Sequence, residues 1–181
     1  IRKTIKENPN KIFIYFSTCS IYDSSKNGSS YVNHKLKMEQ IVEELANQFL
    51  ILRVSNAVGK GGNPNLLMNY LVNAFHQEKE ITVHTLATRN LIDADDVKNI
   101  TLKFINENSF NKIINVAYLE NFSTIQILEI LEKHFNKTAK TSLVKSGQSY
   151  LISIPEAEAY FAENKLTEKK EYLLRIIKRY Y

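Results

Sequence analysis

Several residue types that other protein classes depend on are scarce in this sequence. Its 181 residues include one cysteine, five glycines, three prolines and no tryptophan. A single cysteine excludes an internal disulfide, so a reducing compartment is expected. No apolar run approaches the roughly 20 residues that span a bilayer, and the polar start lacks the layout of a secretory signal. We therefore expect a cytoplasmic protein without a membrane partner.

The charged residues narrow the range of partners. They make up 24% of the chain, and the net charge is +5. The densest basic group, from Lys165 to Arg179, alternates with Glu168 and Glu171 as solvated helix faces do. No zinc-finger spacing or long basic stripe is present, so we expect no nucleic-acid partner. The four histidines lack metal-ligand spacing, so no metal site is expected. A basic protein also suits phosphorylated, anionic substrates.

Residues 11–54 have the pattern of two buried strands joined by a helix. The segments 11–18 and 49–54 are short apolar runs rich in β-branched and aromatic residues, as is typical of buried strands. Small polar residues over 19–30 indicate a loop, and apolar residues at helical spacing predict a helix from about 29 to 48. Strand, helix and strand with short links form a parallel crossover.

The rest of the chain repeats this alternation of helices and strands. Helices are expected near 64–77, 95–107, 123–135 (with Ser123 as N-cap) and 167–180, and strands at 81–84, 112–117 and 141–144. With 44% hydrophobic residues the chain can bury a sizeable core. The sequence therefore predicts an α/β fold.

Tyr31 and Lys35 are the most informative pair in the chain. Residues four apart lie on one face of a helix, so an ammonium is expected beside a phenol. Tyrosine has an unperturbed pKa of about 10, and a neighbouring positive charge favours the phenolate. Such a phenol can transfer protons near neutral pH, and Thr18, at the end of the preceding strand, could hold a substrate oxygen. The alternative is a surface tyrosine and lysine on an amphipathic helix.

Further segments with recognisable motifs surround this pair, in a definite order along the chain. They are Ser17 to Tyr22, Leu52 to Gly59 (Leu-Arg-Val-Ser-Asn-Ala-Val-Gly), Arg89 to Val97 (Arg-Asn-Leu-Ile-Asp-Ala-Asp-Asp-Val), and Ile114 to Ala117 followed by Ser123. With them the chain resembles the extended short-chain dehydrogenase/reductases. Within that group it is similar to the NAD-dependent epimerase/dehydratase family, which acts on nucleotide sugars.

The resemblance implies a role for each residue that matches. Tyr31 would be the acid/base that takes or returns the proton of a sugar hydroxyl during hydride transfer. Lys35 would lower the pKa of Tyr31 and hydrogen-bond the nicotinamide ribose, and Thr18 would hydrogen-bond the reacting oxygen. Ser17 and Val54 would bind the cofactor, NAD or NADP, together with Tyr31 and Lys35.

The same resemblance implies two substrate-binding residues. Asn56 would contact the nucleotide-sugar substrate near its diphosphate, and Arg89 would clamp that diphosphate through its fork of donors. Asn56 could instead cap a turn. Arg89 could instead pair with Asp93, Asp95 or Asp96.

One departure from the family concerns the dinucleotide site. The family binds the dinucleotide at a glycine-rich turn, but no Gly-x-x-Gly-x-x-Gly follows a strand in this chain. We therefore expect this turn to lie before Ile1, and the chain to be the C-terminal part of a longer protein. Residues 1–57 and 90–118 would then be the C-terminal part of a Rossmann-like NAD(P)-binding domain with an incomplete parallel sheet. Residues 58–89 and 119–181 would form a smaller mixed α/β substrate-binding region. The chain alone is expected to show no measurable dehydrogenase activity.

A second departure concerns the reaction. Cys19 and Ser20 stand where the family's sugar dehydratases have an Asp-Glu pair that supplies the extra acid and base for expelling water. Dehydration is therefore disfavoured. The short spacing between Thr18 and Tyr31 implies fewer contacts over the sugar. Cys19 could be a reactive thiol, although a small residue at a strand end is the commoner case.

The leading hypothesis is an NAD(P)-dependent nucleotide-sugar epimerase or reductase. One alternative is a non-catalytic member that senses a dinucleotide or acts as a scaffold, and another is a basic, nucleic-acid-binding derivative of the fold. The joint presence of Thr18, Tyr31 and Lys35 favours the enzyme. Family members often dimerise through the helix that carries Tyr31, so a homodimer is among the expected assemblies.

Overall fold

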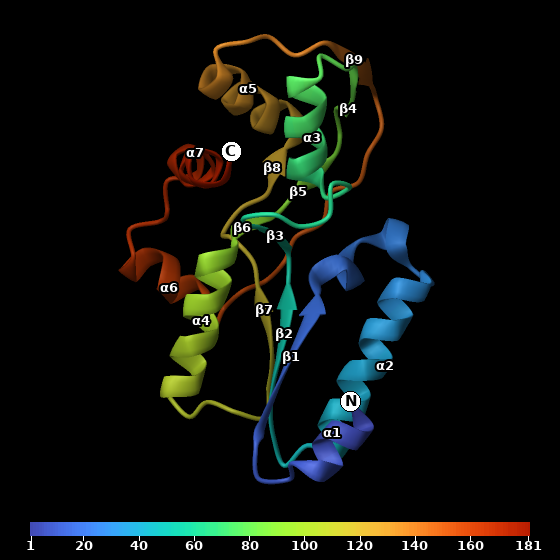
Figure 1. Ribbon diagram of the computed structural model, residues 1–181, viewed down its shortest axis with the longest axis vertical. Helices are drawn as coiled ribbons and strands as arrows, with labels where there is room; N and C mark the ends of the chain where they lie inside the picture. Colours follow the sequence, from blue (N-terminus) through green and yellow to red (C-terminus); the bar gives the residue numbers. More distant parts are fainter.

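A three-stranded parallel sheet is the centre of the lower part of the molecule (Figure 1). The computed structural model describes residues 1–181. The sheet contains β1 (Ile12–Thr18), β2 (Gln48–Val54) and β7 (Lys112–Val116) in the order β1-β2-β7. Thr18 pairs with Val54, and Val54 pairs with Val116, so the three strands end level with one another. The parallel crossover predicted from the sequence is confirmed.

Seven α-helices accompany the strands. They are α1 (Arg2–Glu7), α2 (Ser30–Leu45), α3 (Leu67–His76), α4 (Ala94–Asn106), α5 (Thr124–Phe135), α6 (Glu158–Glu163) and α7 (Lys169–Tyr180). The longest, α2, has 16 residues, and none combines the length and apolar character that crossing a membrane requires.

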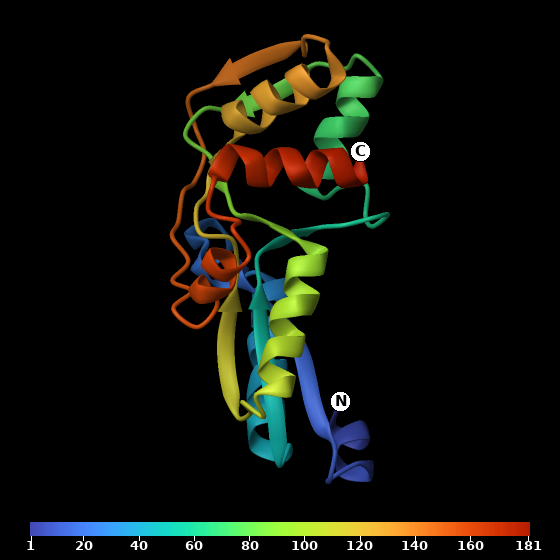
Figure 2. The same cartoon turned by 90° about the vertical axis from the view of Figure 1, so that its left-hand side faces the viewer.

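Helices cover both faces of the central sheet. Figures 1 and 2 show α1 and α2 on one face and α4 on the other. Ile51 of β2 packs with Ile5 and Val42 on the side of α1 and α2. Its neighbours Leu50 and Leu52 belong instead to the large core that includes residues of α4. Successive strand residues point to opposite faces, so a run of three fully buried residues needs cover on both sides.

The other strands pair two by two beyond the carboxyl ends of the central sheet (Figure 1). β3 pairs with β6 and β4 with β9, both parallel, and β5 pairs with β8 antiparallel. The bounds are β3 (Asn56–Val58), β4 (Ile81–His84), β5 (Thr88–Arg89), β6 (Leu91–Asp93), β8 (Phe122–Ser123) and β9 (Thr141–Val144). The division into a dinucleotide-binding and a substrate-binding region stays a prediction.

The structure differs from the sequence prediction mainly in short elements. The expected loop over 19–30 contains two 3-10 turns, η1 (Cys19–Tyr22) and η2 (Ser24–Lys26), and α2 ends at Leu45 rather than near residue 48. The strands β3, β5, β6 and β8 have only two or three residues. Segments so short show no periodicity, so only their pairing partners reveal them.

Two helices begin at capping serines near the predicted positions. Ser29 accepts a hydrogen bond from the Val32 N–H at 3.3 Å and so starts α2 just before Tyr31. Ser123 accepts from the Gln126 N–H at 3.1 Å, and the Gln126 side chain accepts from the Ser123 N–H at 3.0 Å. This reciprocal capping box confirms the start of α5.

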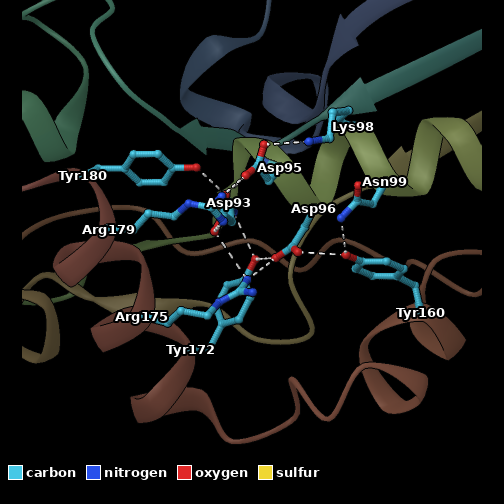
Figure 3. A network of polar contacts seen from close by, with 10 residues as sticks. All are labelled: Asp93, Asp95, Asp96, Lys98, Asn99, Tyr160, Tyr172, Arg175, Arg179 and Tyr180. Atoms are coloured by element: carbon cyan, nitrogen blue, oxygen red, sulfur yellow. Dashed lines mark hydrogen bonds and ion pairs between the residues drawn. The ribbon is translucent and has the colours of Figure 1, made fainter.

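Buried carboxylates attach the C-terminal helix α7 to the start of α4 (Figure 3). Asp96, 2% exposed, accepts hydrogen bonds from the hydroxyls of Tyr160 and Tyr172, both at 2.8 Å. The guanidinium of Arg175 donates to the same carboxylate at 2.5 Å. A buried carboxylate needs this density of donors to offset the loss of water.

Asp93, the N-cap of α4, strengthens this attachment (Figure 3). It is fully buried, accepts from the Tyr180 hydroxyl at 2.7 Å, and lies 3.5 Å from Arg175. Its own N–H donates to the Tyr172 hydroxyl at 3.0 Å. Tyr172 therefore bridges both aspartates, and α7 can dock only where these groups meet.

We expect Tyr172→Phe to lower the free energy of unfolding by about 2 kcal/mol, because one acceptor and one donor lose a buried partner. The matched control is Tyr70→Phe on α3, whose side chain is 46% exposed and makes no hydrogen bond. Urea unfolding followed by circular dichroism would measure both variants. Equal stability of the two would show that the bridge contributes nothing.

Candidate active site

The largest cavity lies at the carboxyl ends of β1 and β2, the edge at which α/β sheets bind ligands. Its volume is about 660 Å³, within the range of roughly 300–1,000 Å³ typical of small-molecule sites. Six of the seven predicted site residues line it, namely Ser17, Thr18, Tyr31, Lys35, Val54 and Asn56. The structure thus brings the predicted catalytic residues to one cavity.

Thr18 is held in place by the turn that follows it. It is the N-cap of η1, and its hydroxyl oxygen accepts a hydrogen bond from the Ser20 N–H at 3.0 Å. The side chain is buried at the cavity wall. Because the oxygen is fixed by this contact, the hydroxyl hydrogen remains to donate to a group in the cavity.

Tyr31 and Lys35 lie one turn apart on α2 and face the end of β1. Lys35 donates from Nζ to the carbonyl oxygen of Phe16 at 2.8 Å. That nitrogen is 5.9 Å from the centre of the Tyr31 ring and 5.0 Å from that of Tyr15. Tyr31 itself is 54% exposed, so its hydroxyl is open to a ligand. The pair therefore has the arrangement that the helical spacing predicts.

An ion pair between Glu39 and Arg53 fixes this face of α2. Glu39, one turn beyond Lys35, is 2% exposed and accepts from Arg53 of β2, with Nη2 to Oε2 at 2.6 Å. The Ser17 hydroxyl donates to the same carboxylate at 2.5 Å. The partnership with Glu39 raises the pKa of Arg53. Through these contacts the helix is joined to both strands whose ends form the cavity.

Asn56 and Arg89 differ in their relation to the cavity. Asn56 lines it, and its side chain donates from Nδ2 to the Asn90 carbonyl at 2.8 Å, which bridges two neighbouring segments. Arg89 is not among the lining residues. It donates from Nη1 to the carbonyls of Thr88 at 2.7 Å and Gln148 at 3.2 Å. The three aspartates proposed as alternative partners of Arg89 pair with Arg175, Arg179 and Lys98 instead.

Cys19 lies at the cavity but is poorly suited to acid/base work. It is 1% exposed, and its thiol donates to the Arg53 carbonyl at 2.9 Å. Burial raises the pKa of Cys19 to about 12, so the thiol stays protonated at neutral pH. Neither Cys19 nor Ser20 can take the place of a carboxylate.

Sequence reasoning missed several lining residues, among them four polar residues from other segments. Lys26 comes from η2, Asn69 from α3, Tyr150 from the segment after β9, and Tyr181 from the end of α7. Tyr181 donates to the Asn69 side chain across the cavity wall. No local pattern distinguishes these residues, because only the packing of distant segments brings them to the cavity.

The charge of the cavity has one sign. Its lining includes the ammonium groups of Lys26 and Lys35 and no aspartate or glutamate. Opposite charges attract more strongly where water is partly excluded. The cavity therefore favours an anionic ligand.

Comparison with known families gives one clear match. Residues 2–117 match the model of the family described as "NAD dependent epimerase/dehydratase family". This match spans more than half of the chain and includes all seven predicted site residues. A comparison with curated proteins finds no match.

Solved structures share the fold. UDP-glucuronic acid 4-epimerase from Bacillus cereus, in complex with UDP-glucuronic acid and NAD, is 20% identical with a TM-score of 0.73 over 97% of this chain. dTDP-glucose 4,6-dehydratase from Bacillus anthracis, in complex with NAD, is 15% identical with a TM-score of 0.72 over 99%. RMD from Pseudomonas aeruginosa, complexed with NADPH, is 14% identical with a TM-score of 0.70 over 96%.

These likenesses establish a Rossmann-like α/β fold. The chain spans 66% of the length of the first two chains and 69% of the third. At such low identities the substrates of those proteins do not transfer with the fold.

We expect Cys19, the only thiol, to react slowly with a thiol reagent at pH 8. A pKa raised from 9.0 to about 12 lowers the thiolate fraction by roughly 1,000-fold, and burial hinders access further. The rate of reaction with Ellman's reagent in buffer should rise by at least about 100-fold in urea. Cys19→Ser serves as the blank, and a fast reaction of the folded chain would contradict the buried placement.

Proposed function

The chain belongs to the NAD-dependent epimerase/dehydratase family. We propose that this protein is an NAD(P)-dependent nucleotide-sugar epimerase or reductase. The observation that carries this proposal is the convergence of Thr18, Tyr31 and Lys35 on one cavity at the carboxyl ends of parallel strands. These are the groups that hydride transfer at a sugar carbon needs from the protein.

The residues of the cavity fit a nicotinamide cofactor, NAD or NADP. Lys35 uses one of its three N–H groups on Phe16, so two remain for ribose hydroxyls. Val54 and Ser17 would provide contact surface, since the Ser17 hydroxyl is engaged by Glu39. When bound, a nicotinamide accepts or returns a hydride at the sugar carbon.

The chain's own groups would manage the proton that accompanies the hydride. The Tyr31 oxygen would take the proton of a sugar hydroxyl as that carbon is oxidised, and return it when the carbonyl is reduced. Thr18 would donate a hydrogen bond to the reacting oxygen and hold it beside Tyr31. The ammonium of Lys35 would attract the negative charge that develops on the Tyr31 oxygen.

The substrate would be an activated sugar bearing a diphosphate. An anionic ligand suits a cavity that contains two ammonium groups and no carboxylate. Asn56 lies on the wall where it could contact the diphosphate. Arg89 would reach it through Nε and Nη2, which make no hydrogen bond within the chain, while Nη1 stays on the carbonyls of Thr88 and Gln148.

Oxidoreduction or epimerisation is favoured over loss of water. Expulsion of a hydroxyl needs an additional acid and base beside the tyrosine. The positions next to Thr18 hold Cys19, which is protonated at neutral pH, and Ser20. The proposed chemistry therefore stops at proton and hydride exchange. The homodimer expected from the sequence stays a prediction.

The function is tested on the whole protein with a panel of UDP-glucose, UDP-glucuronic acid and dTDP-glucose, each with NAD or NADP. Calorimetry measures binding, and chromatography detects epimerised or reduced products. Turnover of one member supports the proposal. Binding of a dinucleotide without turnover of any sugar would favour the sensor or scaffold instead, and no binding of any panel member would overturn the proposal.

Tyr31→Phe should lower kcat by about 100- to 10,000-fold, because it removes the proton-transfer group. The melting temperature should not change, since the side chain is 54% exposed. Tyr70→Phe, at a comparably exposed residue that does not line the cavity, should leave both quantities unchanged. A Tyr31→Phe enzyme of normal kcat would remove Tyr31 from the mechanism.

Lys35→Met should weaken cofactor binding and lower kcat together, because the ammonium serves both the ribose and Tyr31. We expect about a tenfold change in each, the effect of losing a charge-assisted hydrogen bond. The control is Lys37→Met on the exposed side of the same helix, which does not line the cavity. Unaltered cofactor affinity in Lys35→Met would contradict the role in binding.

A further inference from the structure

Residues 145–153, which we name the strap, connect β9 to the segment before α6 and run past the cavity. Main-chain groups fasten its first half, with the Leu86 N–H donating to the Ser146 carbonyl at 3.0 Å and the Thr88 N–H to the Gln148 carbonyl at 3.2 Å. Side chains fasten the second half. These are Asn121, which donates to the Tyr150 carbonyl at 2.5 Å, and Asn115, which donates to the Ser153 carbonyl at 2.8 Å.

Two further contacts set the path of the strap. Gly147 has φ +125, and a Cβ at this position would lie 2.5 Å from the Ala87 nitrogen, so only glycine fits against that backbone. Arg89 donates to the Gln148 carbonyl, and the hydroxyls of Thr88 and Ser149 lie 2.8 Å apart. The strap is therefore a built element despite its lack of helix or strand.

This fastening directs one side chain of the strap into the cavity. Tyr150 lines the cavity, whereas the next residue, Leu151, is 88% exposed. Burial, and after it the charge of Asp23, raise the pKa of Tyr150. Tyr150 lines the same cavity as Thr18, Tyr31 and Lys35.

The phenol of Tyr150 has no partner inside the protein. The Tyr181 hydroxyl, by comparison, donates to Asn69, and Phe16 has no polar group. Apart from Tyr31, Tyr150 is thus the only aromatic residue of the cavity wall whose hydroxyl is available to a ligand. A tyrosine offers both an apolar ring and a donor, which match the C–H face and the hydroxyls of a sugar.

We infer that Tyr150 contacts the sugar moiety of the substrate and contributes to the choice of sugar. The strap holds Tyr150 in position for this contact. This inference rests on the proposed function and extends it to a residue outside the family match. Gly147 and Arg89 act as positioning residues for Tyr150, and of these three residues only Tyr150 contacts the sugar.

The test compares a nucleotide sugar with its nucleotide. Calorimetry on the whole protein measures the Kd of the panel member that binds most tightly and of the same nucleoside diphosphate without the sugar. Tyr150→Phe should weaken binding of the nucleotide sugar by about fivefold, the effect of one neutral hydrogen bond. Tyr150→Ala should weaken it by at least about tenfold. Neither variant should change the Kd of the nucleoside diphosphate by more than about twofold.

A merely structural tyrosine would behave differently. Tyr150→Phe would then change nothing, and Tyr150→Ala would weaken both ligands alike; either result would overturn the inference. Gly147→Ala keeps Tyr150 but displaces the strap, so it should reproduce the sugar-selective loss, whereas Tyr70→Ala should change neither Kd. If the unaltered protein bound no panel member at all, the proposed function itself would fail. If a panel member binds but its Kd is the same in the Tyr150 variants as in the unaltered protein, only the present inference is overturned.

Discussion

The ion pair between buried Glu39 and partly buried Arg53 is the contact on which the geometry of the site depends. Glu39 belongs to α2 and Arg53 to β2, and Ser17 of β1 donates to the same carboxylate. A buried carboxylate persists only when nearly all its hydrogen bonds are made, so the contacts of Glu39 hold the helix in one position relative to the strands. Because Tyr31, Lys35 and Glu39 recur every four residues, fixing Glu39 also fixes the other two on the same helix face. Lys35 adds a second contact, to the carbonyl of Phe16 beside Ser17.

A second set of buried charges performs the corresponding task for the C-terminal part of the chain. Asp93 and Asp96 hold α7 through Tyr172 and Arg175. The chain leaves the central sheet after β7 and returns with Tyr150 and Tyr181, which complete the cavity wall. The two ion-pair systems thus support residues of one cavity, the first those of α2 and the second Tyr181 after α7.

The chemistry open to the cavity follows from what its polar groups can do at neutral pH. Hydroxyls and ammonium groups line it, the one thiol is protonated, and no carboxylate is present. Such a set can bind an anion, hold an oxygen and pass one proton. It lacks the second acid and base that elimination requires, which supports the proposal of an epimerase or reductase.

Local patterns in the sequence were enough to locate most long elements and the core of the site. Helical spacing placed Tyr31 and Lys35 together, and an apolar run ending in Ser17 and Thr18 placed a strand end beside them, because both signals act over a few residues. The sequence did not predict the short strands β3, β5, β6 and β8, because two or three residues form a strand only when a partner supplies the hydrogen bonds.

Tertiary structure alone decided which distant residues join the cavity and what Arg89 contacts. Arg89 matched a family pattern, yet its Nη1 group meets the carbonyl of Gln148, 59 residues away. Tyr150 and Lys26 carry no local signal, since their positions depend on how the strap and the η2 turn pack. The sequence by itself determined the alternation of elements and the Thr18, Tyr31 and Lys35 set, whose members are near one another in the chain. Contacts across long separations were decided by packing, because they arise only after the hydrophobic faces have already met.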